Sequence, residues 1–266
     1  MGNRLADKVA VVTGSSSSNG RAIALALAAE GAPVVCSDFR REAREGGYET
    51  DILTATDDVI RANGGKAEYV ETDAASYSAM ENLVASAVSS FGQLDVMVNN
   101  AGIFTALHTI VDETEDEYDQ TMAVNAKSVW LGCKFAIRQM LTQEPVGGSR
   151  GRIVNIASIG GLVGLAGEPA YCMAKGAVVN LTLQLAVDFA PECININAVC
   201  PGFLATAMVR PFLDDPELNK VLHDKSTWPE LGTAEDVAKA SVFLATSDAR
   251  WATGTLLTID GGFTAP

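Results

Sequence analysis

The stretch that decides the fold is VAVVTGSSSSNGRAIALALA, residues 9–28. A short β-branched run, Val9–Thr13, leads into a turn from Gly14 to Gly20, and an Ala- and Leu-rich helix follows from Arg21. Such a turn leaves backbone N–H groups free, and the positive end of the helix dipole points at the same spot. The order of strand, glycine-containing turn and helix predicts a pyrophosphate site. From this stretch alone, a plain connecting turn remains the alternative.

The alternation of short apolar runs and helical stretches continues along the whole chain. Strands that are apolar on both faces and alternate with helices indicate a parallel sheet covered on both sides. We therefore predict an α/β protein with a Rossmann-like, doubly wound parallel sheet of seven strands and helices on both faces. The expected strands are Val9–Thr13, Pro33–Ser37, Ala67–Glu71, Leu94–Asn99, Arg152–Ala157, Ile194–Val199 and Thr255–Ile259. Helices are expected near residues 20–30, 52–63, 77–91, 115–142, 171–190 and 235–247.

No linker interrupts this alternation, so residues 1–266 are expected to form a single dinucleotide-binding domain. Two segments fall outside the pattern. Residues 40–51 are polar and contain glycine, and in residues 202–230 helix-like pieces are interrupted by Pro211, Pro216 and Pro229. The second segment is predicted to be a substrate lid.

Composition excludes several classes of function. The chain has 19 Lys and Arg against 33 Asp and Glu, a net charge of −14, and the charges are spread out. Nucleic acid and anionic membranes need clustered basic residues, so neither is expected as a partner. No apolar stretch approaches a membrane helix of ~20 residues, and no signal region precedes the first strand. Five cysteines without C-x-x-C spacing and two histidines predict no metal site, and the expected location is the reducing cytoplasm.

A carboxylate follows the second strand at Asp38, eighteen residues past Gly20. A carboxylate there accepts both hydroxyls of an adenosine ribose and repels a 2′-phosphate, which predicts NAD as the cofactor, with NADP less favoured. Arg40 and Arg41 leave NADP open, because a rotated Arg pairs with that phosphate. An ordinary turn aspartate is the alternative.

Two further strand ends carry polar or small residues. Asp73 follows the third strand, where it either lies beside an adenine ring or caps a helix. The fourth strand is followed by Asn99-Asn100-Ala101-Gly102, which suits a nearby nucleotide, although an Asn-rich turn explains it equally.

The chemistry is expected from Tyr171 and Lys175, which share one face of a helix because they are four residues apart. A free phenol titrates near pH 10, so a proton shuttle at neutral pH requires about 3 units of stabilisation of the phenolate. An ammonium group on the same face, helped by a positive nicotinamide ring, is the kind of charge that supplies it. Ser158 follows the fifth strand and is expected to hold the substrate oxygen, or else is a turn serine. Asn125 lies inside a predicted helix, where Asn is unfavourable.

Together these residues resemble the compact branch of the short-chain dehydrogenase/reductase family over essentially the whole chain. The pieces that match include Thr13-Gly14, Asp38, Tyr171 with Lys175, Pro201-Gly202 and the closing Asp260-Gly261-Gly262. The resemblance implies that Tyr171 is the catalytic acid and base and that Ser158 orients the carbonyl or alcohol. It also implies that Lys175 lowers the pKa of the tyrosine and binds the nicotinamide ribose, and that Asn125 holds a relay water. The implied cofactor-binding residues are Gly14, Ser16, Ser18, Asn19, Gly20, Asp38, Asp73, Ala74, Asn100, Ala101, Gly102, Tyr171, Lys175, Pro201, Gly202 and Thr206.

Two departures from the family pattern stand out. The middle glycine of the phosphate loop is Ser18 here, followed by Asn19 instead of Ile or Leu, and a Cβ costs energy where φ is positive. Residues 41–51 are also longer than the usual connection after the second strand, which affects the adenosine-side contacts.

The predicted function is hydride transfer between a nicotinamide cofactor and a secondary alcohol or ketone, in a homotetramer as the family implies. The expected substrate body is apolar, with walls from Ile159, Leu162, Val163 and Leu165. The lid is expected to add Phe203, Leu204, Met208, Val209, Phe212 and Leu213. Glu168 and His108 leave a sugar or polyol as the alternative substrate. A non-enzymatic dinucleotide-sensing regulator is the alternative from another class, and it has no need of Tyr171 or Lys175.

Overall fold

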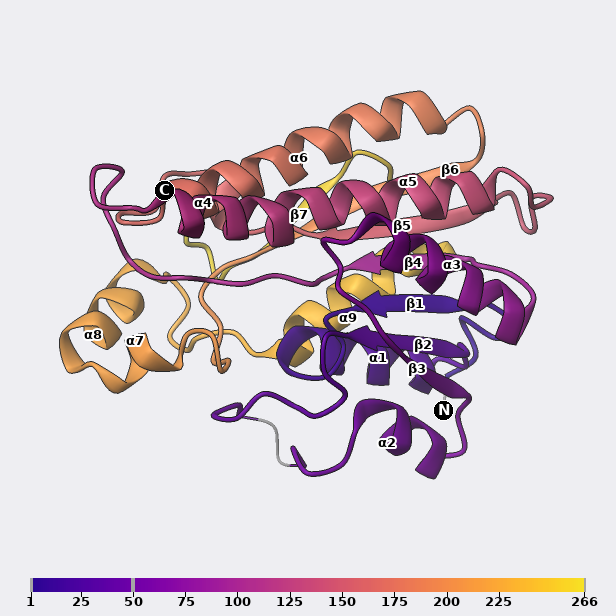
Figure 1. Ribbon diagram of the computed structural model, residues 1–266, viewed down its shortest axis with the longest axis horizontal. Helices are drawn as coiled ribbons and strands as arrows, with labels where there is room; N and C mark the ends of the chain where they lie inside the picture. The colour runs from indigo at the N-terminus through magenta and orange to yellow at the C-terminus, as the bar shows by residue number, and fades with distance from the viewer. Residues whose placement is uncertain (1, 49–50, 266) are drawn as a thin grey trace.

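A computed structural model describes residues 2–48 and 51–265. Within these residues, seven parallel strands form one sheet in the order β3-β2-β1-β4-β5-β6-β7 (Figure 1). The strands are β1 Ala10–Thr13, β2 Val34–Asp38, β3 Ala67–Glu71, β4 Val96–Asn99, β5 Gly151–Ile156, β6 Ile194–Pro201 and β7 Leu256–Ile259. The predicted doubly wound sheet is confirmed, and the bounds of each strand differ from the predicted ones by two residues at most.

The strand order reverses between β1 and β4. Ala10 pairs with Val34 of β2 on one side and with Val96 of β4 on the other. The connections from β1 and from β4 therefore leave in opposite directions, which opens a crevice at the carboxyl ends of these two strands. This is where the sequence placed the nucleotide.

Helices cover both faces of the sheet (Figure 1). Helices α1, α2 and α9 belong to one apolar core, and α3, α5 and α6 to a second core on the opposite face. The bounds are α1 Ser18–Ala29, α2 Thr56–Ala62, α3 Tyr77–Phe91, α5 Ser128–Met140, α6 Pro169–Phe189 and α9 Ala234–Ala245. Near-complete burial of β1, β4 and β5 between these layers explains why their sequences are apolar without alternation.

Two predicted features of the helices need correction. The single helix expected at 115–142 is α4, Glu115–Met122, and α5, joined by a π-helical turn at Ala123–Lys127. In the lid, Pro216 separates two helices, α7, Arg210–Asp214, and α8, Pro216–Lys225, and is the first residue of α8, whereas Pro211 lies inside α7 and does not interrupt it. Proline suits a first position because its missing N–H has no partner there in any case.

Helix α6 also corrects the expectation that no segment is long and apolar enough to cross a membrane. It has 21 residues, and an 18-residue window reaches a mean hydropathy of 1.2. In this fold the helix packs along β6 and holds Lys175 in the interior. Packing against the sheet explains the apolar residues on one face of the helix, whereas 39% of that window is buried and side chains such as Leu183 and Val187 are exposed.

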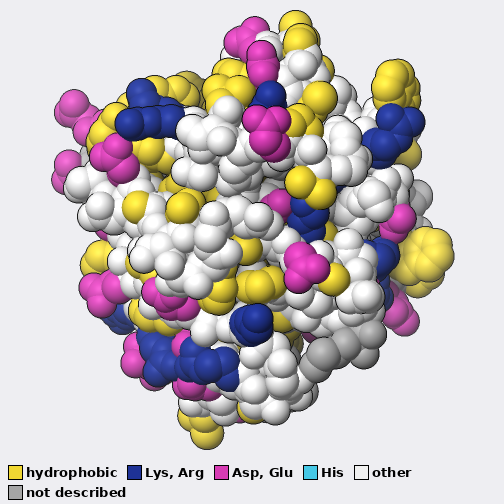
Figure 2. Space-filling model, turned by 90° about the vertical axis from the view of Figure 1, so that its right-hand side faces the viewer, with side chains coloured by type: hydrophobic (Ala, Val, Ile, Leu, Met, Phe, Trp, Pro, Cys, Tyr) yellow, Lys and Arg dark blue, Asp and Glu magenta, His cyan; other side chains and the backbone are white. Residues whose placement is uncertain are grey.

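The surface carries both signs of charge. Figure 2 shows Lys and Arg side chains scattered among Asp and Glu on the face seen from the right-hand side of Figure 1. The described residues of that face form no continuous basic stripe of the kind that binds nucleic acid.

Candidate active site

A cavity of about 1150 Å³ lies at the carboxyl ends of the strands. It runs from the loop after β1, past the residues that follow β2, β3 and β4, to the start of α6 and the lid. All the predicted cofactor-binding residues line it except Thr206. Thr206 is a buried residue of the lid segment itself, and its carbonyl accepts hydrogen bonds from the N–H groups of Val209 and Arg210 at the start of α7.

The turn after β1 is closed tightly enough to require its glycines. A Cβ on Gly20 would lie 1.9 Å from the carbonyl oxygen of Gly14, and Gly14 itself has φ +65°. Ser18, the first residue of α1, has φ 49°, so this serine occupies the left-handed region that sequence reasoning identified as costly. The first turn of α1 has no acidic residue, and the side chain of Ser17 does not cap it. The positive end of the helix therefore remains open towards the cavity.

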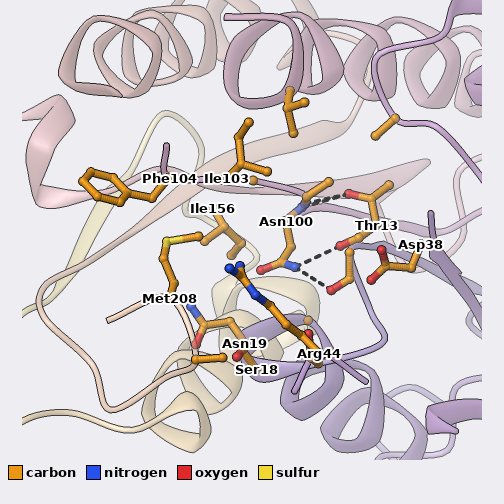
Figure 3. A pocket seen from close by; sticks show the side chains of 18 of the residues that line it. Thr13, Ser18, Asn19, Asp38, Arg44, Asn100, Ile103, Phe104, Ile156 and Met208 are labelled. Carbon is orange, nitrogen blue, oxygen red and sulfur yellow. Dashed lines mark hydrogen bonds between the residues drawn. The ribbon is translucent and has the colours of Figure 1, made fainter. Parts of the chain in front are cut away.

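Asn100 ties this turn to the end of β4 (Figure 3). Its Nδ2 donates hydrogen bonds to the carbonyls of Thr13 (2.9 Å) and Gly14 (3.1 Å). The N–H groups of Asn100 and Ala101 both donate to Oγ1 of Thr13 (3.0 and 3.1 Å). The amide-rich sequence after β4 thus fixes the loop that faces the cavity.

The adenosine end is built around Asp38. Its Oδ2 accepts a hydrogen bond from the N–H of Ser16 (3.0 Å), and its Oδ1 accepts one from the N–H of Phe39 (2.8 Å). The carboxylate is therefore held in place at the end of β2, on the lining of the cavity. Asp73 lines the same end, and its Oδ1 accepts from the N–H of Ala75 (2.9 Å).

The two arginines that left the cofactor choice open are placed differently. Arg41 points away from the cavity and forms ion pairs with Asp57 (2.8 Å) and Asp58 (2.9 Å). Arg40 lines the cavity, as does Arg44, which sequence reasoning missed. In Figure 3 the side chain of Arg44 extends into the cavity between Asn19 and Asn100.

The segment after β2 borders the cavity more closely than the sequence indicated. Its unusual length was apparent, but nothing in the pattern showed that residues 39, 40 and 42–45 line the cavity. Residues 49 and 50 of this segment lie outside the described part of the chain. Arg210 of α7 donates to the carbonyl of Gly46 (3.0 Å) and stacks over the ring of Tyr48 (5.3 Å). These contacts join the lid to the segment after β2.

Tyr171 lies at the other end of the cavity and is the third residue of α6, which begins at Pro169. Burial raises the pKa of its phenol to about 12, and the charge of Glu168 adds to this effect, whereas a hydrogen bond with the Ser158 side chain lowers it. Sequence reasoning expected Lys175 to bring the pKa of this tyrosine down. In the protein alone the pKa is raised instead, because the cost of placing a phenolate in a dry site exceeds the stabilisation.

Lys175 lies one turn further along α6 and is 4% exposed. Its Nζ is 5.8 Å from the centre of the Tyr171 ring and donates a hydrogen bond to the carbonyl of Ile156 (2.9 Å). Burial lowers the pKa of this ammonium to about 8. The lysine is therefore positioned by the end of β5 and remains mostly charged at neutral pH.

Ser158 follows β5 in an extended conformation and is buried. Its Oγ accepts a hydrogen bond from the N–H of Gly160 (3.1 Å), which leaves the hydroxyl proton available to a partner. The hydrogen bond to Tyr171 noted above shows that the two hydroxyls are adjacent. Both line the cavity, so one oxygen of a ligand has room to meet both.

Asn125 lies in the π-helical turn and is fully buried, but it does not line the cavity. Its Nδ2 donates to the carbonyl of Ile103 and its Oδ1 accepts from the N–H of the same residue, both at 2.8 Å. A Cβ added to Gly102 would lie 3.4 Å from this Oδ1 and 3.7 Å from Nζ of Lys175. Asn125 therefore fixes the backbone beside the lysine, and π-helical turns often occur at such sites.

The substrate end of the cavity is mainly apolar. Phe104 makes edge contacts with the rings of Tyr171 (5.9 Å) and Phe212 (5.5 Å), which joins the loop after β4, α6 and the lid. The remaining apolar lining there comes from Ile103, Ile159, Leu165, Phe203, Leu204, Met208 and Val209. Leu162, Val163 and Leu213, which the sequence placed in these walls, do not line the cavity. His108 does not line it either, because it pairs with Glu117 (3.1 Å). Among the described residues, no group of three His, Cys, Asp or Glu side chains is arranged to hold a metal.

Comparisons with known proteins agree with this arrangement. A family model described as enoyl-(acyl carrier protein) reductase matches residues 14–264. The chain is 40% identical over 263 residues to the 2-(R)-hydroxypropyl-CoM dehydrogenase of Xanthobacter autotrophicus, which covers 97% of this chain and 99% of that protein. It is 36% identical over 262 residues to the cyclopentanol dehydrogenase of a Comamonas strain, with 98% and 99% covered.

A solved structure has the same fold. It is a candidate 2-deoxy-D-gluconate 3-dehydrogenase from Agrobacterium tumefaciens with bound NADP. The two chains superpose with a TM-score of 0.85 at 33% identity, and 98% of each is covered.

Proposed function

The chain belongs to the short-chain dehydrogenase/reductase family, and we propose that Tyr171 is its catalytic acid and base. The protein is an oxidoreductase that acts on secondary alcohols or the matching ketones. The observation that carries the proposal is the meeting of Tyr171, Ser158 and Lys175 at one end of a cavity whose other end is a phosphate loop. A dinucleotide-sensing regulator does not require this set of side chains.

The described residues fit a nicotinamide dinucleotide. The open end of α1 suits its pyrophosphate, and the carboxylate of Asp38 suits a ribose diol. Oδ1 of Asn19 is buried without a hydrogen-bond partner among the described residues, as expected of a group whose partner is a ligand. A bound cofactor of this kind accepts the hydride from the alcohol or returns it to the ketone.

The protein's own groups handle the proton and the orientation. With its pKa at about 12, the Tyr171 phenol holds a proton at neutral pH and is ready to donate it to the oxygen of a ketone. Ser158 donates its hydroxyl proton to the same oxygen and keeps it against the phenol. In the oxidising direction the phenol must first be ionised, and the ammonium of Lys175 favours the phenolate. Asn125 keeps the backbone beside Lys175 in place, and we propose that a relay water binds there.

NAD is the proposed cofactor, because the carboxylate of Asp38 repels a 2′-phosphate. Arg41 is occupied by Asp57 and Asp58, which removes one of the two residues that left NADP open. Arg40 and Arg44 remain on the lining, and a relative of the same fold has been solved with NADP. The cofactor preference therefore needs the direct comparison described in the Discussion.

The remaining features are proposals from the sequence. Residues 1–266 act as one domain in which the segment 202–230 is the substrate lid, supported by the contacts of Met208, Val209 and Phe212 with the cavity. We propose a cytoplasmic homotetramer that binds a small molecule and neither nucleic acid nor membrane, because closed symmetry is the common arrangement of soluble oligomers. Light scattering tests the assembly: a 28 kDa particle at micromolar concentration would contradict it.

Absorbance of the reduced nicotinamide tests the activity. Purified protein is assayed with NAD and NADP against a panel of secondary alcohols, and with the reduced cofactors against the matching ketones. We expect turnover of alcohols and ketones that have an apolar body. Absence of turnover across the panel with both cofactors, in protein that binds cofactor, would contradict the function.

A further inference from the structure

The feature that the mechanism above does not use is the carboxylate of Glu168. This residue immediately precedes α6 and lines the cavity beside Tyr171. Its side chain does not cap the helix, and no hydrogen bond or ion pair of its carboxylate exists among the described residues. The carboxylate therefore faces the substrate end of the cavity without a protein partner.

The start of α6 has its cap from another residue. Oε1 of Glu113, in the segment before α4, accepts a hydrogen bond from the N–H of Ala170 (3.3 Å). Glu113 does not line the cavity. An acidic residue at the start of a helix usually caps the free backbone N–H groups. Here Glu113 does so, and Glu168 has no capping role.

The charge is isolated in its part of the cavity. The other acidic residues on the lining, Asp38, Glu42, Glu45 and Asp73, belong to the segments that follow β2 and β3. The lining residues next to it in sequence are the apolar Leu165 and Tyr171, on whose phenol its charge acts. Burial raises the pKa of Glu168 to about 7, which agrees with a partly buried carboxyl that has no cation beside it.

A half-buried carboxyl in an apolar site is costly unless a hydrogen-bond donor reaches it. We propose that Glu168 is a specificity-determining residue that binds a second hydroxyl of the substrate, so that the preferred substrate is a diol or a hydroxyketone. This inference rests on the proposed function, because it takes Tyr171 and Ser158 as the groups that hold the reacting oxygen. Glu168 immediately precedes α6, and its charge acts on the phenol of Tyr171, so a second hydroxyl on a carbon near the reacting one would meet the carboxylate. The same carboxylate disfavours an anionic substrate.

The test compares substrates that differ by one hydroxyl. The ratio of kcat/KM for trans-cyclopentane-1,2-diol to that for cyclopentanol is measured in wild type, Glu168→Gln, Glu168→Leu and the control Glu113→Gln. A hydrogen bond to a charged group corresponds to roughly a ten- to hundredfold preference, so we expect wild type to favour the diol by about that factor. Glu168→Leu is expected to bring the ratio near one, Glu168→Gln to give an intermediate ratio, and Glu113→Gln to keep the wild-type ratio. A purely structural role at the helix start would instead change the ratio in Glu113→Gln and leave it unchanged in Glu168→Leu.

A binding measurement completes the test without turnover. In Tyr171→Phe saturated with NAD, calorimetric titration is expected to show tighter binding of the diol than of cyclopentanol, and the difference is expected to disappear in Tyr171→Phe/Glu168→Leu. Equal kcat/KM for diol and cyclopentanol in active wild type would overturn the inference and leave the proposed function intact. A preference for trans-2-aminocyclopentanol over the diol would also overturn it, because the partner would then be an ammonium. Inactivity on every alcohol and ketone would instead contradict the proposed function.

Discussion

The Nζ atom of Lys175 lies 5.8 Å from the centre of the Tyr171 ring, one turn away on the same helix. The hydrogen bond from this Nζ to the carbonyl of Ile156, at the end of β5, holds the ammonium group in this position beside the phenol. Burial has opposite effects on the two groups: it raises the pKa of Tyr171 to about 12 and lowers that of Lys175 to about 8. Each charged form is costly in this buried site, and we propose that the neighbouring ammonium favours the phenolate.

Lys175→Met is expected to raise the pH at which alcohol oxidation is half-maximal by about one unit or more, because the phenolate loses its neighbouring cation. It should also weaken cofactor binding if the ammonium contacts the nicotinamide ribose. The pH profile of kcat/KM and a fluorescence titration with NADH measure the two effects. An unchanged pH profile would show that Lys175 does not act on Tyr171.

Asp38→Ala is expected to reduce the preference for NAD over NADP by about ten- to a hundredfold in kcat/KM, since a charged hydrogen-bonding partner of the ribose is removed. Asp73→Asn, on the same end of the cavity, should leave the ratio close to that of wild type. A wild type that favours NADP, or an unchanged ratio in Asp38→Ala, would contradict the assignment of Asp38.

Ser18→Gly is expected to keep or improve cofactor affinity and to leave the fold intact, because glycine adopts φ 49° without strain. Asp7, at φ 62° and remote from the cavity, provides the control: Asp7→Gly relieves the same kind of strain and should not affect affinity. Isothermal titration with NADH compares the variants. A marked loss of affinity in Ser18→Gly alone would mean that the Ser18 side chain itself binds the phosphate.

Glu168→Gln is expected to stabilise the protein at alkaline pH. The pKa of Glu168 is raised from 4.5 to about 7, so its contribution to stability is present below about pH 4.5 and is lost as pH rises to about 7. The Tm of Glu168→Gln relative to wild type should therefore increase between pH 5 and pH 7 and stay level above it. Glu117→Gln should instead show a Tm difference that is constant between pH 5 and pH 8 and changes only below about pH 4.5, because hydrogen bonds from Thr114 lower the Glu117 pKa. A Tm difference for Glu168→Gln that is equal at pH 5 and pH 8 would contradict this placement.

The fold was predictable because its signals are local. Continuous apolar runs such as Val96–Asn99, alternating with helical periods, are enough to indicate a parallel sheet, and the loop after β1 then fixes where the strand order reverses. The break of the predicted helix 115–142 at Asn125 was not predictable, because a π-helical turn differs from an α-helix by one residue in its hydrogen bonds. The unusual Asn inside that helix was the one sequence signal for it.

The site was predictable where motif spacing determines contact, as for Tyr171 and Lys175 on one helix. It was not predictable where contact depends on how loops fold back. Arg44 reaches the cavity and His108 does not, yet both belong to irregular segments with no periodicity to orient them. The pKa of Tyr171 also escaped sequence reasoning, because burial is a property of the assembled site.

The central claim, that Tyr171 is the catalytic acid and base, is tested most directly by Tyr171→Phe. The substitution removes one hydroxyl and little volume, and the exposed Tyr118→Phe serves as the control. We predict a fall in kcat of at least ~10²–10⁴-fold for Tyr171→Phe with the affinity for NADH unchanged, and wild-type values for Tyr118→Phe. A Tyr171→Phe enzyme that turns over a secondary alcohol at near wild-type kcat would contradict the account.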